Sequence, residues 1–186
     1  SDIGTEPKRS FRYTFSIAGI AEAMPEYTVV STNRPTFQME GGPEIKYIQH
    51  TFKYPGRVMW QDVNVTVVDP GGQEDNSSLL MNVLASSGYS VPRTDGADVR
   101  NSISKSKANT SIGIPRITQI DANGKQVDQW SLHNAFITQV QFGELNYESD
   151  DIVKIQMTFK YDYATFQVAS TSAPAVAVGV RSKATI

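Results

Sequence analysis

The clearest structural signal in the chain lies at residues 130–166, which read WSLHNAFITQVQFGELNYESDDIVKIQMTFKYDYATF. In the second half of this stretch, apolar and polar residues alternate. One side carries Val153, Ile155, Met157, Phe159 and Tyr161, and the other carries Lys154, Gln156, Thr158 and Lys160. Because successive side chains of a strand point to opposite faces, this period of two predicts a half-buried β-strand.

The first half of the stretch alternates less strictly and predicts a second strand. Its two faces would carry Phe136, Thr138, Val140 and Phe142 on one side and Ile137, Gln139 and Gln141 on the other. The turn-prone residues 146–151 separate the two runs, an arrangement typical of a β-hairpin. No residue of this hairpin looks like a reaction centre, so the stretch predicts architecture and not chemistry.

Further alternating runs predict strands at residues 11–17, 27–32 and 57–68, and a hairpin around Asn123-Gly124. We expect one helix over residues 76–88, capped by Asn76 or Ser77, because an apolar stripe recurs at helical spacing. The stripe consists of Leu79, Leu80, Val83 and Leu84. Residues 89–113 are rich in Ser, Asn and Lys with little periodicity, and we expect them to form a long loop.

Composition narrows the possible functions. The chain has 186 residues, a formal net charge of -2 and no cysteine, which excludes disulfides, thiol nucleophiles and cysteine zinc sites. A near-neutral charge argues against tight binding to nucleic-acid phosphates. The longest small apolar run, residues 173–180, is far short of the ~20 residues of a membrane helix, so we expect no membrane segment.

Candidate chemistry is sparse. His50 and His133 lack a neighbouring ligand cluster, and neither a nucleophile elbow nor a phosphate loop is present, so we expect no enzyme activity, metal or cofactor. Trp60 and Trp130 could stack a ligand, but strand tryptophans more often fill a core or an interface. The carboxylates Glu144, Glu148, Asp150 and Asp151 could form an acid–base pair or a cation site; we interpret them as a solvated acidic surface.

Four motifs together resemble the tail tube proteins of contractile-tailed phages of the T-even myovirus type, and the related inner-tube proteins of contractile injection systems. The motifs are Trp130-Ser131-Leu132-His133-Asn134-Ala135-Phe136, Val140-x-Phe142-Gly143-x-Leu145-x-Tyr147-x-Ser149, the strand from Ile152 to Tyr161-Asp162-Tyr163, and Trp60-x-x-Val63-x-Val65-x-Val67. The match in the order of elements spans about residues 11–166.

The resemblance implies a mainly β fold, a two-sheet antiparallel β-sandwich or barrel with one short flanking α-helix and long loops. An N-terminal arm (1–10) and a C-terminal extension (169–186) would flank the domain at 11–168. We expect the large residues on the apolar strand faces to be buried in the sandwich or at subunit contacts. They are Phe11, Phe15, Val63, Val65, Phe136, Val140, Ile155, Met157 and Phe159.

The implied function is structural. Six copies would form a ring, and rings would stack into a hollow tube inside a contractile sheath, in a virion assembled in the host cytoplasm. Expected partners are further copies of the chain, the sheath, the baseplate or initiator, the tail terminator, the tape measure protein, and DNA that passes without specific binding. A tube-initiator or baseplate protein, the inner tube of an injection system, and a ligand-binding β-sandwich module are the alternatives.

Three sets of residues follow as candidate sites. Residues 36–56 would form a long protruding hairpin or loop that stacks one ring on the next, unless they fold as an ordinary edge hairpin against their own sandwich. Its stacking residues would be Ile45, Tyr47, Ile48, Phe52 and Tyr54. The lumen would be lined by Gln139, Gln141, Lys154, Gln156 and Thr158, and the acidic residues near the channel rim would be Glu144, Glu148, Asp150 and Asp151.

Overall fold

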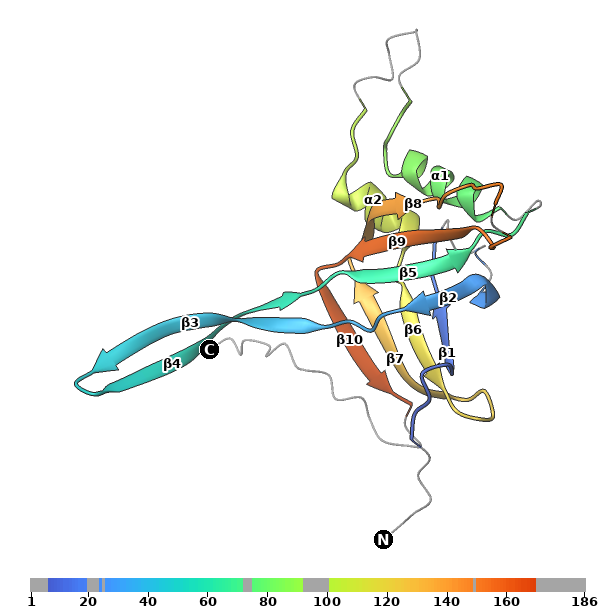
Figure 1. Cartoon of the computed structure of the whole chain (residues 1–186). Coiled ribbons are helices and arrows are strands. Elements are labelled where there is room, and N and C mark those ends of the chain that lie inside the picture. Colours follow the sequence, from blue (N-terminus) through green and yellow to red (C-terminus); the bar gives the residue numbers. More distant parts are fainter. Residues whose placement is uncertain are drawn as a thin grey trace, which may run out of the picture.

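A computed structural model describes residues 7–19, 24, 26–71, 75–91, 101–148 and 150–169. This part of the chain forms two four-stranded antiparallel sheets, a long projecting hairpin and two α-helices (Figure 1). The predicted mainly β sandwich is therefore confirmed. Most of the predicted N-terminal arm, and nearly all of the predicted C-terminal extension, lie outside the described residues.

The two sheets divide the strands as follows. Sheet A has the order β1-β6-β7-β10, with β1 (Tyr13–Ser16), β6 (Arg116–Ile120), β7 (Gln126–His133) and β10 (Tyr163–Val168). Sheet B has the order β2-β5-β9-β8, with β2 (Val29–Thr32), β5 (Val63–Val68), β9 (Lys154–Lys160) and β8 (Phe136–Gln141). A short 3-10 turn, Glu26–Thr28, precedes β2.

The chain changes sheets at two tight corners. Asn134 and Ala135 join β7 to β8, while Tyr161 and Asp162 join β9 to β10. Asn134 has φ 55°, a left-handed conformation that Asn tolerates better than most residues. These corners let the strands of the two sheets cross steeply in Figure 1, as in orthogonally packed sandwiches.

The core lies between the sheets. Three alternate residues of β5 and three of β9 are fully buried: Val63, Val65, Val67, Ile155, Met157 and Phe159. From sheet A, Phe15 meets the ring of Phe159 with centroids 5.9 Å apart. The period-two alternation therefore predicted this part of the core correctly, including all six buried members of the expected set, Phe15, Val63, Val65, Ile155, Met157 and Phe159.

Two expected core residues are placed differently. Phe11 precedes β1 and is 72% exposed. In β8 the register shifts between Ile137 and Gln139, so that Ile137 lies opposite Phe159, and Phe136 lies opposite Lys160. Such a bulge inserts one extra residue and reverses the alternation. The predicted shared face of Phe136 and Val140 is therefore wrong, because only Val140, opposite Met157, points to the core.

The expected helix is present as α1 (Asn76–Ser86), with Leu80 and Val83 buried. Its cap is Asp75, whose carboxylate accepts a hydrogen bond from the Ser77 backbone N–H at 3.0 Å. The predicted cap at Asn76 or Ser77 is thus wrong. Asn76 is buried, and its side-chain amide donates to the Val68 carbonyl at 2.9 Å, which ties the helix to the end of β5.

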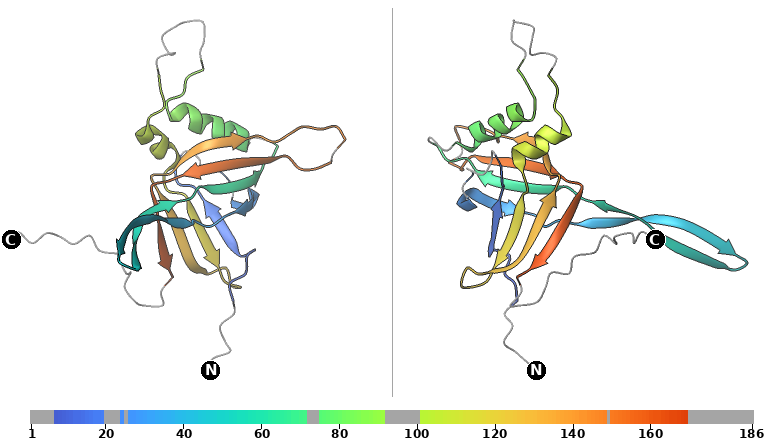
Figure 2. Two further views of the ribbon diagram at one scale, coloured as in Figure 1. Left: turned by 60° about the vertical axis from the view of Figure 1, so that its left-hand side comes forward. Right: turned by 180° about the vertical axis from the view of Figure 1, so that it is seen from behind.

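A second helix, α2 (Lys105–Ile112), lies inside the predicted loop 89–113 and corrects that expectation. The Ser104 side chain caps it, and Gly113 ends it at φ 70°. Ala108 and Ile112, four residues apart, are buried. Helix α2 contacts α1 and β8, so the pair covers the β8 side of the sandwich (Figure 2).

The most conspicuous element is the hairpin of β3 (Phe37–Tyr47) and β4 (His50–Trp60), which projects from the sandwich (Figures 1 and 2). Of the two forms expected for residues 36–56, a protruding hairpin or a loop, the structure has the hairpin. The single strand expected at 57–68 is wrong, because it is split at Gln61 and Asp62. A Cβ added at Gly42 would lie 2.1 Å from the Tyr54 carbonyl oxygen. Glycine there permits a bulged close approach, and the hairpin continues through it.

Candidate assembly interface

An aromatic cluster anchors the base of the hairpin to sheet B. The ring of Trp60 lies 5.6 Å from Phe37 and 6.0 Å from Tyr161 between centroids. The Tyr161 hydroxyl donates to the Gln61 carbonyl at 2.8 Å, and the Gln61 backbone N–H donates to the Thr36 carbonyl at 2.8 Å. These contacts fix the direction in which the hairpin leaves the sandwich.

Burial raises the pKa of Tyr161 to about 12, and the nearby Asp62 carboxylate adds to the effect by disfavouring a second negative charge. The phenol therefore stays protonated and keeps its role as a hydrogen-bond donor to Gln61 throughout the neutral range.

Beyond its base, the hairpin is amphipathic and has no core of its own. The register pairs Ile45 with Phe52 and Tyr47 with His50, which places these apolar groups on one face together with Tyr54. All five predicted stacking residues, Ile45, Tyr47, Ile48, Phe52 and Tyr54, are at least half exposed. The hairpin therefore does not fold against its own sandwich, and it presents the kind of apolar surface that marks a contact with another molecule.

The five residues predicted to line a lumen come together on one face of sheet B. Gln139 lies opposite Thr158, and Gln141 lies opposite Gln156, on the face that points away from the core. On β5, Asn64 continues the row and its side-chain oxygen accepts a hydrogen bond from the Thr158 hydroxyl at 2.8 Å. Lys154 shares this face at the start of β9. Sheet B thus has one buried, apolar face and one polar face.

Strands β2 and β8 form the two edges of sheet B, each hydrogen-bonded to one strand of the described chain. Because every pair in the sheet is antiparallel, β8 runs in the same direction as β5, and β2 runs opposite to both. A copy related by rotation would therefore offer its β2 to β8 in the antiparallel sense, which satisfies both edges.

The predicted acidic residues lie on the loop between β8 and β9. Glu144, Glu148, Asp150 and Asp151 belong to residues 142–153, at the end of sheet B opposite the hairpin (Figures 1 and 2). The same loop carries an apolar component that the sequence analysis missed. Leu145 and Ile152 are 88% and 65% exposed, and Tyr147 is fully exposed.

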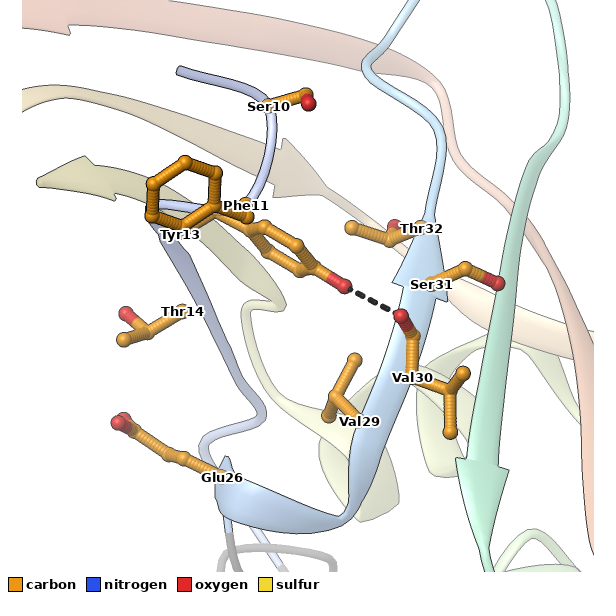
Figure 3. Close-up of a pocket in the computed structure, with 9 residues that line it drawn as sticks. All are labelled: Ser10, Phe11, Tyr13, Thr14, Glu26, Val29, Val30, Ser31 and Thr32. Carbon is orange, nitrogen blue, oxygen red and sulfur yellow. Dashed lines mark hydrogen bonds between the residues drawn. The ribbon is translucent and has the colours of Figure 1, made fainter. Parts of the chain in front are cut away.

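A broad depression of about 910 Å³ lies beside the edge strand β2, between β1 and β2 (Figure 3). Here the Tyr13 hydroxyl donates to the Val30 carbonyl at 3.0 Å and ties the two sheets together. Burial raises the pKa of Tyr13, so this donor too stays protonated. Among the described residues that line this hollow, Glu26 is the one that carries a charge, and they offer no acid–base pair.

The histidines have structural surroundings. The ring of His133 stacks on Tyr163 at 4.6 Å and shares a hydrogen bond with the Thr165 hydroxyl at 2.8 Å. His50 sits in the exposed hairpin next to its turn. Within the described residues, no three His, Cys, Asp or Glu side chains are grouped closely enough to hold a metal ion. No described helix is long and apolar enough to cross a membrane.

The described fold is similar to components of contractile injection systems. It matches the tube-terminating cap of the anti-feeding prophage with a TM-score of 0.64 and 17% identity over 91% of this chain and 97% of that one. It matches the sheath/tube terminator of the extracellular contractile injection system PVC with the same score and identity, over 89% and 99% of the two chains. The PVC sheath–tube complex gives a TM-score of 0.60 at 17% identity over 90% and 96%.

These identities are low, so the comparison establishes the fold alone. No family model and no curated protein sequence matches the chain. The fold that the sequence resemblance implied is nevertheless the one observed, with nearly complete coverage of both chains in each comparison.

Proposed function

We propose that this protein is a structural subunit that assembles into rings and stacks them into the hollow tube of a contractile particle. The observation that carries the proposal is sheet B, which is buried on one face, polar on the other, and has an open strand at each edge. A monomer would expose both edges as sites for uncontrolled pairing, which stable soluble proteins normally avoid. Closing the sheets into a ring removes those edges.

Ring closure also explains the polar face. When sheets join edge to edge around an axis, one face lines the bore and the other stays against each subunit's own core. The face available for the bore is the one that carries Gln139, Gln141, Gln156 and Thr158. Identical rotated copies meet through the same β8–β2 contact, which is the condition for a closed cyclic assembly. Six copies is the number that the family resemblance implies.

The bore would be weakly charged. The outward positions of β5, β8 and β9 include Lys154 and Lys160 and no carboxylate, while the acidic residues stay on the loop at the sheet's end. Such a surface has too few cations to bind phosphate tightly and no row of carboxylates to repel it. We infer a conduit that carries DNA in a phage tail, or protein in an injection system, without specific binding.

Stacking of rings would use the hairpin. A projecting arm that exposes five large apolar groups gains about 25 cal/mol for each Å² that a partner covers. The other partners would be those of such a tube: the sheath outside, and initiator and terminator proteins at its ends. The related structures are tube, terminator and baseplate components, which supports a structural role in preference to an enzymatic one.

A tube-terminating protein is the second candidate, because two of the similar structures are of a tube-terminating cap and a sheath/tube terminator. Negative-stain microscopy of the purified protein separates the candidates. A tube subunit forms stacked tubes of open-ended length, whereas a terminator forms single rings. A uniform population of monomers at high concentration would overturn both.

A matched variant tests the role of the hairpin. Replacing residues 43–54 with a short Gly/Ser linker leaves the anchoring cluster of Phe37, Trp60 and Tyr161 in place. We expect this variant to lose the outer part of the β3–β4 hairpin, to keep its sandwich and its rings, and to form no tubes. Tubes of normal length from the variant would show that the hairpin is not the stacking element.

A further inference from the structure

The two ends of sheet B carry surfaces that complement each other. The hairpin leaves at the end of β2 and the start of β5, while the β8–β9 loop lies at the end of β8 and the start of β9. Because β5 and β8 run in the same direction, these two features lie at opposite ends of the sheet (Figures 1 and 2). One end therefore projects an arm, and the other end presents a loop.

The tip of the arm is held in an unfavourable conformation. Ile48 is the first residue of the two-residue turn, with φ 54°, and its side chain is 86% exposed. Glycine or asparagine is usual at such a position, and a β-branched residue there costs about 1–2 kcal/mol. Among the described residues, Ile48 does not belong to the hydrophobic core or to the side chains packed against it. Backbone strain of this kind is typical of residues that make a functional contact.

The charges at the two ends are opposite. Residues 45–53, at the tip, contain Lys46 and Lys53 and no carboxylate. Residues 142–153, in the loop, contain four carboxylates and no Lys or Arg. Lys53 lies 3.7 Å from Glu44, but both side chains are largely exposed, so this pair neutralises the tip only weakly.

The loop end is also shaped to receive an apolar group. An open hollow of about 440 Å³ lies between the loop and the start of α1, and Pro70, Phe142, Leu145 and Val153 contribute apolar atoms to it. Asp69 and Asp75 line its rim and add to the negative charge. The backbone N–H of Asp69 donates to the Val153 carbonyl at 3.1 Å, which braces the loop's second arm against β5.

We propose that the β8–β9 loop and this hollow form the docking site for the hairpin tip of a second copy of the chain, in the next ring. The proposal rests on the tube function and names the receptor that this function requires. Ile48 and its apolar neighbours enter the hollow, while Lys46 and Lys53 face Glu144 and Glu148. A contact between two different surfaces of identical subunits repeats without closing, which produces an open-ended tube.

The absence of native cysteine permits a direct test by crosslinking. A chain that carries both Ile48→Cys and Leu145→Cys cannot join the two within itself, because they lie at opposite ends of the molecule. Mild oxidation of assembled tubes should therefore give a ladder of linked chains on a denaturing gel. Each single variant should give monomers and at most dimers.

Charge reversal gives an independent readout in the cysteine-free chain. Lys46→Glu with Lys53→Glu, and separately Glu144→Lys with Glu148→Lys, should each shorten tubes at least several-fold at low salt. Combining all four changes should restore most of the length, because the attraction is re-formed with its signs exchanged. The matched control is Arg116→Glu with Lys125→Glu, two exposed cations in β6 and in the β6–β7 turn, which should leave tube length unchanged.

The results of these experiments distinguish a failure of the docking site from a failure of the proposed tube function. Wild-type protein that forms neither rings nor tubes overturns both. If the wild type forms tubes, but tubes of the double-cysteine variant give no ladder and charge-reversed loops still stack to normal length, the docking site alone is overturned and the loop is left for the sheath or another partner. A ladder together with rescue by the fourfold variant establishes the site.

Discussion

The same four residues, Thr-Phe-Lys-Tyr, occur in two strands of this protein with opposite fates. In β4 they begin at Thr51, where Phe52 and Tyr54 are 52% and 50% exposed on the projecting hairpin. In β9 they begin at Thr158, where Phe159 is fully buried and Tyr161 packs against the core. Identical local sequence forms a strand in both places, but it faces a core in only one of them.

The difference lies in what the neighbouring strands supply. Strand β9 lies between β5 and β8, and sheet A covers its apolar face, so Phe159 meets Phe15 and Val63. Within the described part of the chain, strand β4 pairs with β3 alone, and no second sheet covers that pair. A two-stranded ribbon is marginally stable in isolation. The hairpin thus carries a strand's alternation without a single-chain core, and that combination is what a subunit contact requires.

The largest expected difference between the two tetrapeptides is the effect of truncating their phenylalanines. Phe159→Ala should lower the free energy of unfolding of the dispersed subunit by about 3–5 kcal/mol, because it leaves a cavity in the core. Phe52→Ala should change it by no more than about 0.5 kcal/mol, because that side chain is half exposed. Urea denaturation measures both.

In tube formation, measured by microscopy, the phenylalanine of the hairpin should matter although it adds little to subunit stability. Phe52→Ala should shorten or abolish tubes while its subunit stays folded. If Phe52→Ala destabilised the isolated subunit as much as Phe159→Ala, the hairpin would belong to a hidden intramolecular core, and the contrast between the two tetrapeptides would fail.

The sequence predicted the two-sheet core well because its strands alternate strictly, as at Ile155, Met157 and Phe159. It misplaced Phe136 because a bulge in β8 reverses the alternation, and a single sequence does not mark where a bulge falls. It missed α2 because that helix is short and polar. The Ser104 cap, the Ala108–Ile112 spacing and the Gly113 stop were the available signals.

The candidate site was predicted in part. Gln139, Gln141, Gln156 and Thr158 do share one polar face, since their positions follow from strand alternation and register. A protruding hairpin was one of the two forms expected for residues 36–56, but strand pairing on both sides of Gly41-Gly42-Pro43 was not, because these residues are typical of a break. Opposite Pro55-Gly56 they form a bulge instead. The relation between the hairpin and the loop at opposite ends depends on topology, which local patterns do not contain.

A smaller effect is expected at the two tyrosines of the repeated tetrapeptide. Tyr161→Phe removes the hydrogen bond to the Gln61 carbonyl and should cost about 1 kcal/mol in the dispersed subunit. Tyr54→Phe, on the exposed hairpin, should cost about 0.5 kcal/mol or less. Because the Tyr161 bond holds the hairpin base, its loss should also broaden the distribution of tube lengths.

The dependence of stability on pH tests the Tyr161 position separately. The pKa of Tyr161 is raised to about 12 from an ordinary value of 10.0, so its contribution to stability is complete below pH 10 and is lost as the pH rises through about 12. Between pH 10 and 12 the wild type should therefore lose more stability than Tyr161→Phe. The difference should be on the order of 1 kcal/mol, since the site is partly open to solvent. Equal losses would refute the link.

The smallest expected effect has the opposite sign and concerns the hairpin's turn. Ile48→Gly relieves the left-handed strain at φ 54°, worth about 1–2 kcal/mol, but frees the unfolded chain by about 0.5–1 kcal/mol. The dispersed subunit should therefore become slightly more stable, by roughly 0.5–1 kcal/mol, as thermal melts would record. Tube formation should weaken at the same time, because the 86% exposed side chain that enters the neighbouring copy is gone. If Ile48→Gly changed subunit stability and tube formation in the same direction, the strain in this turn would not be balanced by a contact with another copy. Ile48→Asn, which tolerates the same backbone and keeps a side chain, serves as the matched control for the backbone effect.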